Sequence, residues 1–189
     1  MTITMDSFYR INIAGLERDL QICKVSDRLS IAAFVLFGDV ELTVTAAREL
    51  LKMAPPHDIL ITAEAKGIPL VHEMARQSGR NEYIVARKGV KLYMKDVFSV
   101  EVQSITTVKR QSLHIDATEA NLMKGRNVLI VDDVISTGES VRAVELLVKE
   151  AGGIVAGRMA ILAEGDAKFR EDILFLQQLP LMNPDGSPM

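Results

Sequence analysis

The sequence is poor in residue types that mark several protein classes. Its 189 residues include no tryptophan and a single cysteine, Cys23. One cysteine excludes an internal disulfide framework and a cysteine-rich zinc site, and it fits a reducing compartment. The histidines His57, His72 and His114 are scattered without metal-ligand spacing, which argues against a structural zinc and a histidine-based nucleophile relay.

Long apolar runs and an excess of positive charge are also missing. Charged residues interrupt every apolar run well before the roughly 20 residues that a membrane-spanning helix needs, and no charged-then-apolar leader opens the chain. The net charge of -3 at pH 7 gives no general attraction to nucleic acid or to an acidic membrane surface. We therefore expect no nucleic-acid partner, no membrane partner and a cytoplasmic location.

The composition favours a compact fold, because 48% of the residues are hydrophobic and 25% are charged. The length suits a single domain covering residues 1–189. Within it we expect an N-terminal region over about 1–40 and a core over about 41–180. Residues 183–189 are rich in turn formers, so we expect this tail to fray.

Hydrophobic periodicity predicts an α/β fold. Alternation of apolar and polar residues over 9–36 indicates a small antiparallel sheet, and apolar residues at helical spacing predict a helix over 41–53. Short apolar strands then alternate with helices, which is typical of a parallel sheet covered on both faces. The expected strands are 58–62, 83–86, 127–131 and 155–162, and the expected helices are 68–77 and 139–151. Alternation over 98–106 and 111–117, around a basic turn at 108–110, predicts a hairpin that projects from the sheet.

The most informative stretch runs from Val128 to Ser140. It contains a buried strand, the carboxylates Asp132 and Asp133, and a turn with hydroxyls and a glycine that opens a helix. Such a turn binds phosphate, since a helix N-terminus presents free N–H groups and partial positive charge. Two carboxylates beside an anion site suit ribose hydroxyls and the water shell of Mg²⁺, although an isolated Asp-Asp pair more often caps a turn.

This stretch resembles the signature of type I phosphoribosyltransferases, an apolar strand followed by two acidic residues and a Thr-Gly turn. The resemblance implies a type I phosphoribosyltransferase-like fold, with a parallel sheet flanked by helices and a small antiparallel hood. It also implies Mg²⁺-dependent transfer of the phosphoribosyl group of phosphoribosyl pyrophosphate (PRPP) to a nitrogenous base. Asp132 and Asp133 would be catalytic and would hold Mg²⁺ through water.

Two further segments extend the resemblance. Residues 64–68 look like the pyrophosphate loop of adenine phosphoribosyltransferases, with Lys66 where arginine is usual. Residues 87–91 resemble the family's basic run, which on physical grounds alone is either an anion site or a solvated loop. All three segments follow strands, where open α/β sheets bind ligands. The implied PRPP-binding residues are Ala65, Lys66, Gly67, Arg87, Lys88, Lys91, Asp132, Asp133, Ser136, Thr137, Gly138, Glu139 and Ser140.

The hairpin corresponds to the family's mobile loop, which closes over the site and excludes water. Part of it also resembles xanthine phosphoribosyltransferases. Glu101 is the candidate for proton transfer to or from the base, and the alternative is an outward polar residue of an alternating strand.

Residues 34–40 resemble an element of the adenine enzymes' hood, with Gly38 where arginine is usual. The resemblance makes Phe34, Leu36 and Phe37 base-binding candidates, although alternating aromatics are more often core. It favours purine salvage with adenine as substrate and leaves open hypoxanthine, guanine, xanthine or a non-catalytic PRPP-binding regulator. Members of this family are usually homodimers, so the resemblance also implies a homodimer. The motifs of nucleotide kinases and dinucleotide-dependent enzymes are missing.

Overall fold

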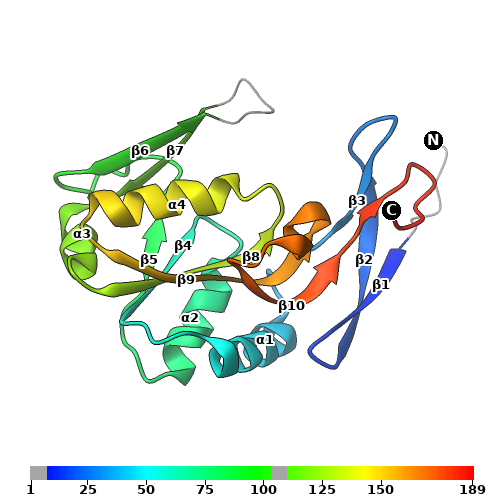
Figure 1. The fold of residues 1–189 in the computed structure, drawn as a ribbon, viewed down its shortest axis with the longest axis horizontal. Helices are drawn as coiled ribbons and strands as arrows, with labels where there is room; N and C mark the ends of the chain where they lie inside the picture. Colours follow the sequence, from blue (N-terminus) through cyan, green and yellow to red (C-terminus); the bar gives the residue numbers. More distant parts are fainter. Residues whose placement is uncertain (1–7, 104–109) are drawn as a thin grey trace.

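The computed structural model describes residues 8–103 and 110–189. Its elements form a parallel sheet with helices on both faces, a small antiparallel sheet at one end and a projecting hairpin (Figure 1). The predicted α/β class is confirmed. The described part of the chain contains no helix long and apolar enough to cross a membrane.

The central sheet has five strands, and every neighbouring pair is parallel. In sheet order the strands are β10 (Leu174–Leu179), β9 (Ile154–Glu164), β8 (Asn127–Ile135), β4 (Ile59–Ala63) and β5 (Ile84–Ala86). All five residues of β4 are buried, as expected for a strand between two helical layers. The strand β8 runs four residues beyond its predicted end, so Asp132 and Asp133 lie within it. The strand β10 was not predicted, because its two glutamines interrupt the apolar run.

Two helices cover each face of the sheet. On one face lie α4 (Glu139–Glu150) and α3 (Ala117–Met123), and on the other lie α1 (Val40–Met53) and α2 (Ile68–Gln77) (Figure 1). The buried residues accordingly form two clusters, one beneath each helical layer. The helix α3 was not predicted, although Asp116 and Glu119 form a capping box that marks its start.

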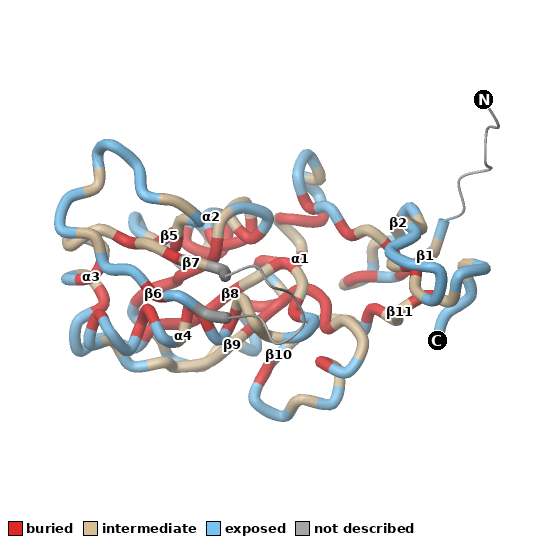
Figure 2. The backbone as a smooth tube through the Cα atoms, turned by 90° about the horizontal axis from the view of Figure 1, so that it is seen from above, coloured by how far each residue is buried: buried red, intermediate tan, exposed pale blue. Residues whose placement is uncertain are grey.

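The small sheet, called the hood below, has the order β1 (Phe8–Ile13), β2 (Leu16–Lys24), β3 (Ser30–Ala33) and β11 (Leu181–Met182). Its neighbouring strands are antiparallel. It lies at the end of the molecule opposite α3 (Figures 1 and 2). Its last strand comes from the C-terminal segment, which sequence patterning did not anticipate.

The C-terminal tail differs from the expectation of a frayed end. The N–H of Met189 donates to the carbonyl of Leu181 at 2.8 Å, and the N–H of Asn183 donates to the carbonyl of Ser187 at 2.8 Å. The side chain of Asp185 accepts from the N–H of Ser187 and closes the turn. The turn residues of this segment therefore fold the tail back onto the hood.

The projecting hairpin consists of β6 (Phe98–Gln103) and β7 (Arg110–Ile115), which pair antiparallel as predicted. Val100, Leu113 and Ile115 are buried in the same cluster as α4. Residues 104–109, which include most of the predicted basic turn, lie outside the described residues. A short 3-10 helix, η1 (Gly165–Phe169), follows β9.

Candidate active site

The two carboxylates of β8 lie at the C-terminal edge of the parallel sheet. Asp133 is 4% exposed, and Lys66 Nζ lies 2.8 Å from its Oδ2 atom in an ion pair. The N–H of Asp133 donates to Asp132 Oδ1 at 2.9 Å. Burial and the neighbouring charge of Asp133 raise the pKa of Asp132, and the charge of Lys66 opposes this shift. Positive charge from a ligand or metal would therefore stabilise the ionised pair.

The loop after β4 packs directly against this pair. A Cβ atom at Gly67 would clash with Thr62 Oγ1 and would lie 3.3 Å from Asp132 Oδ1, so the loop backbone is close to both side chains. In addition to its ion pair, Lys66 donates to the carbonyl of Phe34 at 3.4 Å. Ala65 precedes Lys66 in this loop, and the Glu64–Ala65 peptide bond is cis. The predicted pyrophosphate loop and the acidic pair thus meet at one place.

The basic run after β5 is tied to the same loop through Glu64. The N–H of Lys88 donates to Glu64 Oε2 at 3.0 Å, and Arg87 Nη1 lies 3.6 Å from Glu64 Oε1. The Lys88 hydrogen bond, followed by the charges of Lys91 and Arg87, lowers the pKa of Glu64. Lys88 and Lys91 are exposed. The run therefore offers positive charge beside the loop at 64–67, and its binding of pyrophosphate stays a prediction.

The third loop joins β8 to α4. Ser136 and Thr137 are exposed, and Gly138 caps α4 with a φ of 80°. The N-terminal N–H groups of this 12-residue helix can bind an anion. The first turn contains Glu139 and Ser140. These placements fit the predicted phosphate loop.

Arg170 lies next to the loop that joins β8 to α4, and it was not predicted from the sequence. A Cβ atom at Gly138 would clash with Arg170 Nη1, so the guanidinium lies against the loop. Arg170 is held by two hydrogen bonds to Asp172, at 2.9 and 2.7 Å. Asp172 also lies 3.7 Å from Arg158, which pairs with Glu145 of α4. These residues line a cavity of about 500 Å³ that also includes Thr137 and Gly138.

The base-binding candidates have different environments. Phe34 is 5% exposed and Leu36 is fully buried, and both belong to the core cluster shared by the hood, α1 and α2. Phe37 is 52% exposed. Phe34 contacts Lys66, in the loop after β4, through its backbone carbonyl. Contacts of these residues with a base stay a prediction.

Glu101 lies on β6, opposite Ser112 of β7, and is exposed. The hairpin position agrees with the expected element. The role of Glu101 in proton transfer stays a prediction.

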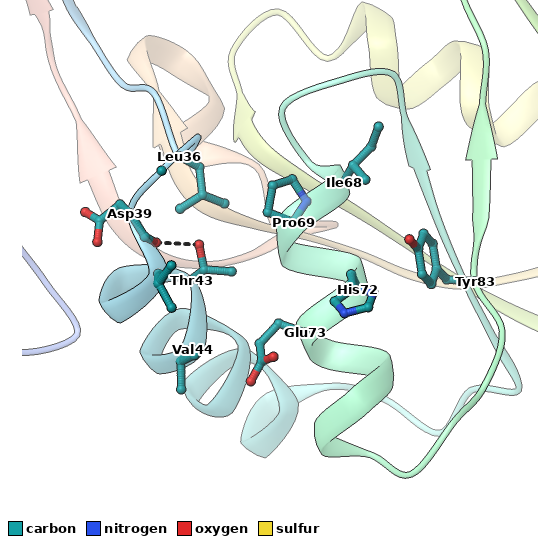
Figure 3. A pocket seen from close by; sticks show the side chains of 11 residues that line it. Leu36, Asp39, Thr43, Val44, Ile68, Pro69, His72, Glu73 and Tyr83 are labelled. Atoms are coloured by element: carbon teal, nitrogen blue, oxygen red, sulfur yellow. Dashed lines mark hydrogen bonds between the residues drawn. The ribbon is translucent and has the colours of Figure 1, made fainter.

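A further cavity, of about 310 Å³, lies between the N-terminal halves of α1 and α2 (Figure 3). Its lining includes Leu36 and Gly38 from the segment after the hood, together with His72 and Tyr83, whose rings meet edge to face. No residue of the loops at 64–67, 87–91 or 132–140 lines it. It is therefore separate from the acidic pair.

The acidic pair fits a magnesium site. Mg²⁺ commonly uses one or two carboxylates and completes its shell with water and ligand phosphates. Asp132 and Asp133 supply two carboxylates at the end of β8, with the loop that contains Gly67 packed against them. Within residues 8–103 and 110–189, no group of three or more His, Cys, Asp and Glu side chains could hold a metal by itself. A ligand that brings phosphate oxygens would supply what the pair lacks.

Parallel strands covered by helices on both faces, with loops gathered around an acidic pair at their C-terminal ends, define a class of α/β proteins that bind their ligands at this edge of the sheet. The family described as phosphoribosyl transferase domain matches residues 44–177. The chain belongs to the phosphoribosyl transferase domain family.

Individual relatives agree with this assignment. The chain is 35% identical over 116 residues to an adenine phosphoribosyltransferase of Ureaplasma parvum, covering 61% of this chain and 64% of that protein. It is 39% identical over 107 residues to the Thermotoga petrophila enzyme of the same name, covering 57% and 59% of the two chains. It is 32% identical over 111 residues to a hypoxanthine/guanine phosphoribosyltransferase of Methanotorris igneus, covering 59% and 56%. The matches therefore span about three-fifths of these relatives.

Solved structures share the fold. Adenine phosphoribosyltransferase from Thermoanaerobacter pseudethanolicus superposes with a TM-score of 0.62 at 22% identity, covering 91% of this chain and 95% of that one. The Saccharomyces cerevisiae enzyme, complexed with an imino-altritol bisphosphate and adenine, gives a TM-score of 0.62 at 18% identity, with 90% and 94% coverage. The type I phosphoribosyltransferase-like fold implied by the sequence is confirmed.

Proposed function

We propose that the chain is a purine phosphoribosyltransferase that transfers the phosphoribosyl group of PRPP to a purine base in purine salvage, with adenine favoured. One observation carries the proposal. The pyrophosphate-type loop packs on the acidic pair, with Gly67 against Asp132 and Lys66 paired to Asp133. The names of the relatives, adenine and hypoxanthine/guanine phosphoribosyltransferases, support a purine.

The three loops bind different parts of PRPP. The N–H groups of the loop at 65–67 and the positive charges of Lys66 and of the run at 87–91 bind the pyrophosphate. The loop at 136–140 and the start of α4 bind the 5′-phosphate. Asp132 and Asp133 bind the ribose hydroxyls and would hold Mg²⁺ through water. Bound there, Mg²⁺ would supply positive charge beside the pyrophosphate.

The reaction is a displacement at the anomeric carbon of the ribose. The bond from this carbon to the pyrophosphate oxygen breaks, and pyrophosphate leaves with the electron pair. A ring nitrogen of the base forms the new bond, and its proton passes to Glu101 or to water. Negative charge on Asp132 and Asp133 stabilises the positive charge that develops on the sugar.

We also propose that the enzyme is a cytoplasmic homodimer, as is usual for the family. Light scattering of the purified protein should then give a mass of twice 20.8 kDa. A monomer at assay concentration would contradict this part of the proposal.

The test is an assay of pyrophosphate release from PRPP and Mg²⁺ with adenine, hypoxanthine, guanine, xanthine, uracil and orotate. The controls are Asp132→Asn and Asp133→Asn, which keep side-chain volume and remove charge. We expect release that depends on a purine and falls by about a hundredfold or more in either variant, because several kcal/mol of electrostatic stabilisation are lost. Binding of PRPP without turnover of any base would instead indicate a non-catalytic regulator.

A further inference from the structure

Glu164 is a half-buried carboxyl that the proposed reaction has not used. It is the last residue of β9, and its side chain makes no hydrogen bond or ion pair with any residue that the structure describes. Burial raises the pKa of this carboxyl, and the charge of Lys66 acts in the opposite direction. Polar groups in such places usually have partners. An unpaired carboxyl beside a ligand site therefore points to a ligand contact.

Glu164 lies where the parallel sheet meets the hood. It pairs with Leu179 of β10, and the chain then continues directly into β11 of the hood. The next residue, Gly165, is packed so that an added Cβ would lie 3.3 Å from the side chain of Leu181. On the same edge, Lys66 connects Asp133 to the carbonyl of Phe34, which follows the hood strand β3.

The order of the strands places Glu164 opposite the leaving group. The acidic pair is on β8, the two loops assigned to pyrophosphate follow β4 and β5 on one side, and β9 is the neighbour on the other side. A displacement at carbon needs the nucleophile on the face opposite the leaving group, so orientation decides the rate. The base must then approach from the side of β9, whose last side chain is Glu164. This step rests on the proposed function.

We propose that Glu164 is a specificity-determining residue that selects bases with an exocyclic amino group over bases with a carbonyl at the same position. A carboxylate accepts hydrogen bonds from an amino group, whereas a carbonyl oxygen in the same place offers only lone pairs. Adenine and hypoxanthine differ in this way at a single ring position. A site built to pair with one polar group rejects its mismatched analogue strongly, because buried polar groups are left unpaired.

The test is Glu164→Gln, which keeps the shape of the side chain and adds an N–H group that can donate a hydrogen bond to a carbonyl oxygen of the base. We expect the ratio of kcat/KM for adenine to kcat/KM for hypoxanthine to fall by about tenfold or more, mainly through the KM of the base. The KM for PRPP should stay within about twofold. The matched control is Glu171→Gln, at an exposed position in the following loop, which should leave the ratio unchanged.

A purely structural role predicts different results. If Glu164 served only to balance Lys66, Glu164→Gln would change the KM for PRPP or the melting temperature and would leave the base ratio unchanged, which would overturn the proposal. A wild-type protein that prefers hypoxanthine would also overturn it. If the wild-type protein transfers no base at all, the proposed function itself fails, and this inference fails with it.

Discussion

At the scale of single residues, Gly67 shows how closely the site is packed. Its φ of -73° is accessible to any residue, so the requirement for glycine comes from space and not from backbone conformation. The neighbouring Thr62 is fully buried and cannot easily move. Lys66 depends on this packing, because it reaches both Asp133 and the carbonyl of Phe34 from the same loop.

We therefore predict that Gly67→Ala impairs both stability and substrate binding. The added methyl group should lower the free energy of unfolding by about 1–3 kcal/mol and raise the KM for PRPP by about tenfold or more, because the loop is displaced. Denaturant unfolding and steady-state kinetics measure the two effects. Gly89→Ala is the matched control for the unfolding measurement, since a Cβ there has nothing within 4 Å. An equal loss of stability in the two variants would contradict the packing argument.

Residues of the site could be predicted from the sequence where they are close together along the chain. Asp132, Asp133 and the phosphate loop lie within a few positions of one another, so the sequence pattern alone was enough to predict them as one site. Arg170 and Glu164 could not be found in this way. Arg170 approaches Gly138 from a distant loop, and the position of Glu164 has meaning only once the order of the strands is known.

At the scale of elements, the helices α1 and α2 are joined by polar contacts beneath the sheet. Glu73, which is 7% exposed, accepts two hydrogen bonds from Arg76 and one from Gln77. Gln77 also donates to the carbonyl of Val44 in α1 at 2.9 Å. The hydrogen bond from Arg76, with a further contribution from Gln77, lowers the pKa of Glu73 to about 2 from its ordinary value of 4.5.

This network predicts a stability difference that depends on pH. A lowered pKa in the folded state contributes stability above pH 4.5, and this contribution is lost as the pH falls toward 2. Glu73→Gln should therefore cost about 1–2 kcal/mol at pH 7, with the difference from wild type shrinking below pH 4.5. Urea unfolding across this range measures it, with the exposed Glu82→Gln as control. A difference that does not change with pH would show that the ionised form is not the cause.

The junction of β8 and α4 gives a second prediction at this scale. Gly138→Ala should be destabilised both by its positive φ, at about 1–2 kcal/mol, and by displacement of Arg170. Gly79→Ala supplies the matched control, because Gly79 has a φ of 69° and nothing within 4 Å of an added Cβ. The excess loss in Gly138→Ala should disappear when Arg170→Ala is also present. An excess that persists in the double variant would mean that Arg170 does not support the loop.

At the scale of the whole molecule, strands from the N-terminal and C-terminal regions of the described chain meet in the hood. The strand β11 pairs with β3, and Met182 is fully buried in the cluster that includes Ile11, Ile13 and Phe34. Alternation in the N-terminal region was enough to predict a small antiparallel sheet there. It was not enough to predict β11, because a two-residue strand has no detectable period and its partners lie some 150 positions away along the chain.

Because Met182 is buried where β11 joins the hood, we predict that Met182→Ala destabilises the protein by about 2–5 kcal/mol, the usual cost of removing a large buried side chain. Met189→Ala, at a position that is 56% exposed, should change the free energy of unfolding by less than about 0.5 kcal/mol. Thermal and denaturant unfolding measure both. Similar values for the two variants would contradict the placement of the C-terminal segment in the hood.

The central claim is that three loops at one sheet edge form a single site for transfer of the phosphoribosyl group to a purine. The most direct measurement is to mix the protein with PRPP, Mg²⁺ and adenine and to quantify nucleotide and pyrophosphate together by mass spectrometry and a coupled assay. We predict equal amounts of adenosine 5′-monophosphate and pyrophosphate, with neither formed when the base is omitted. Pyrophosphate released without nucleotide, or no product with any purine, would contradict the claim.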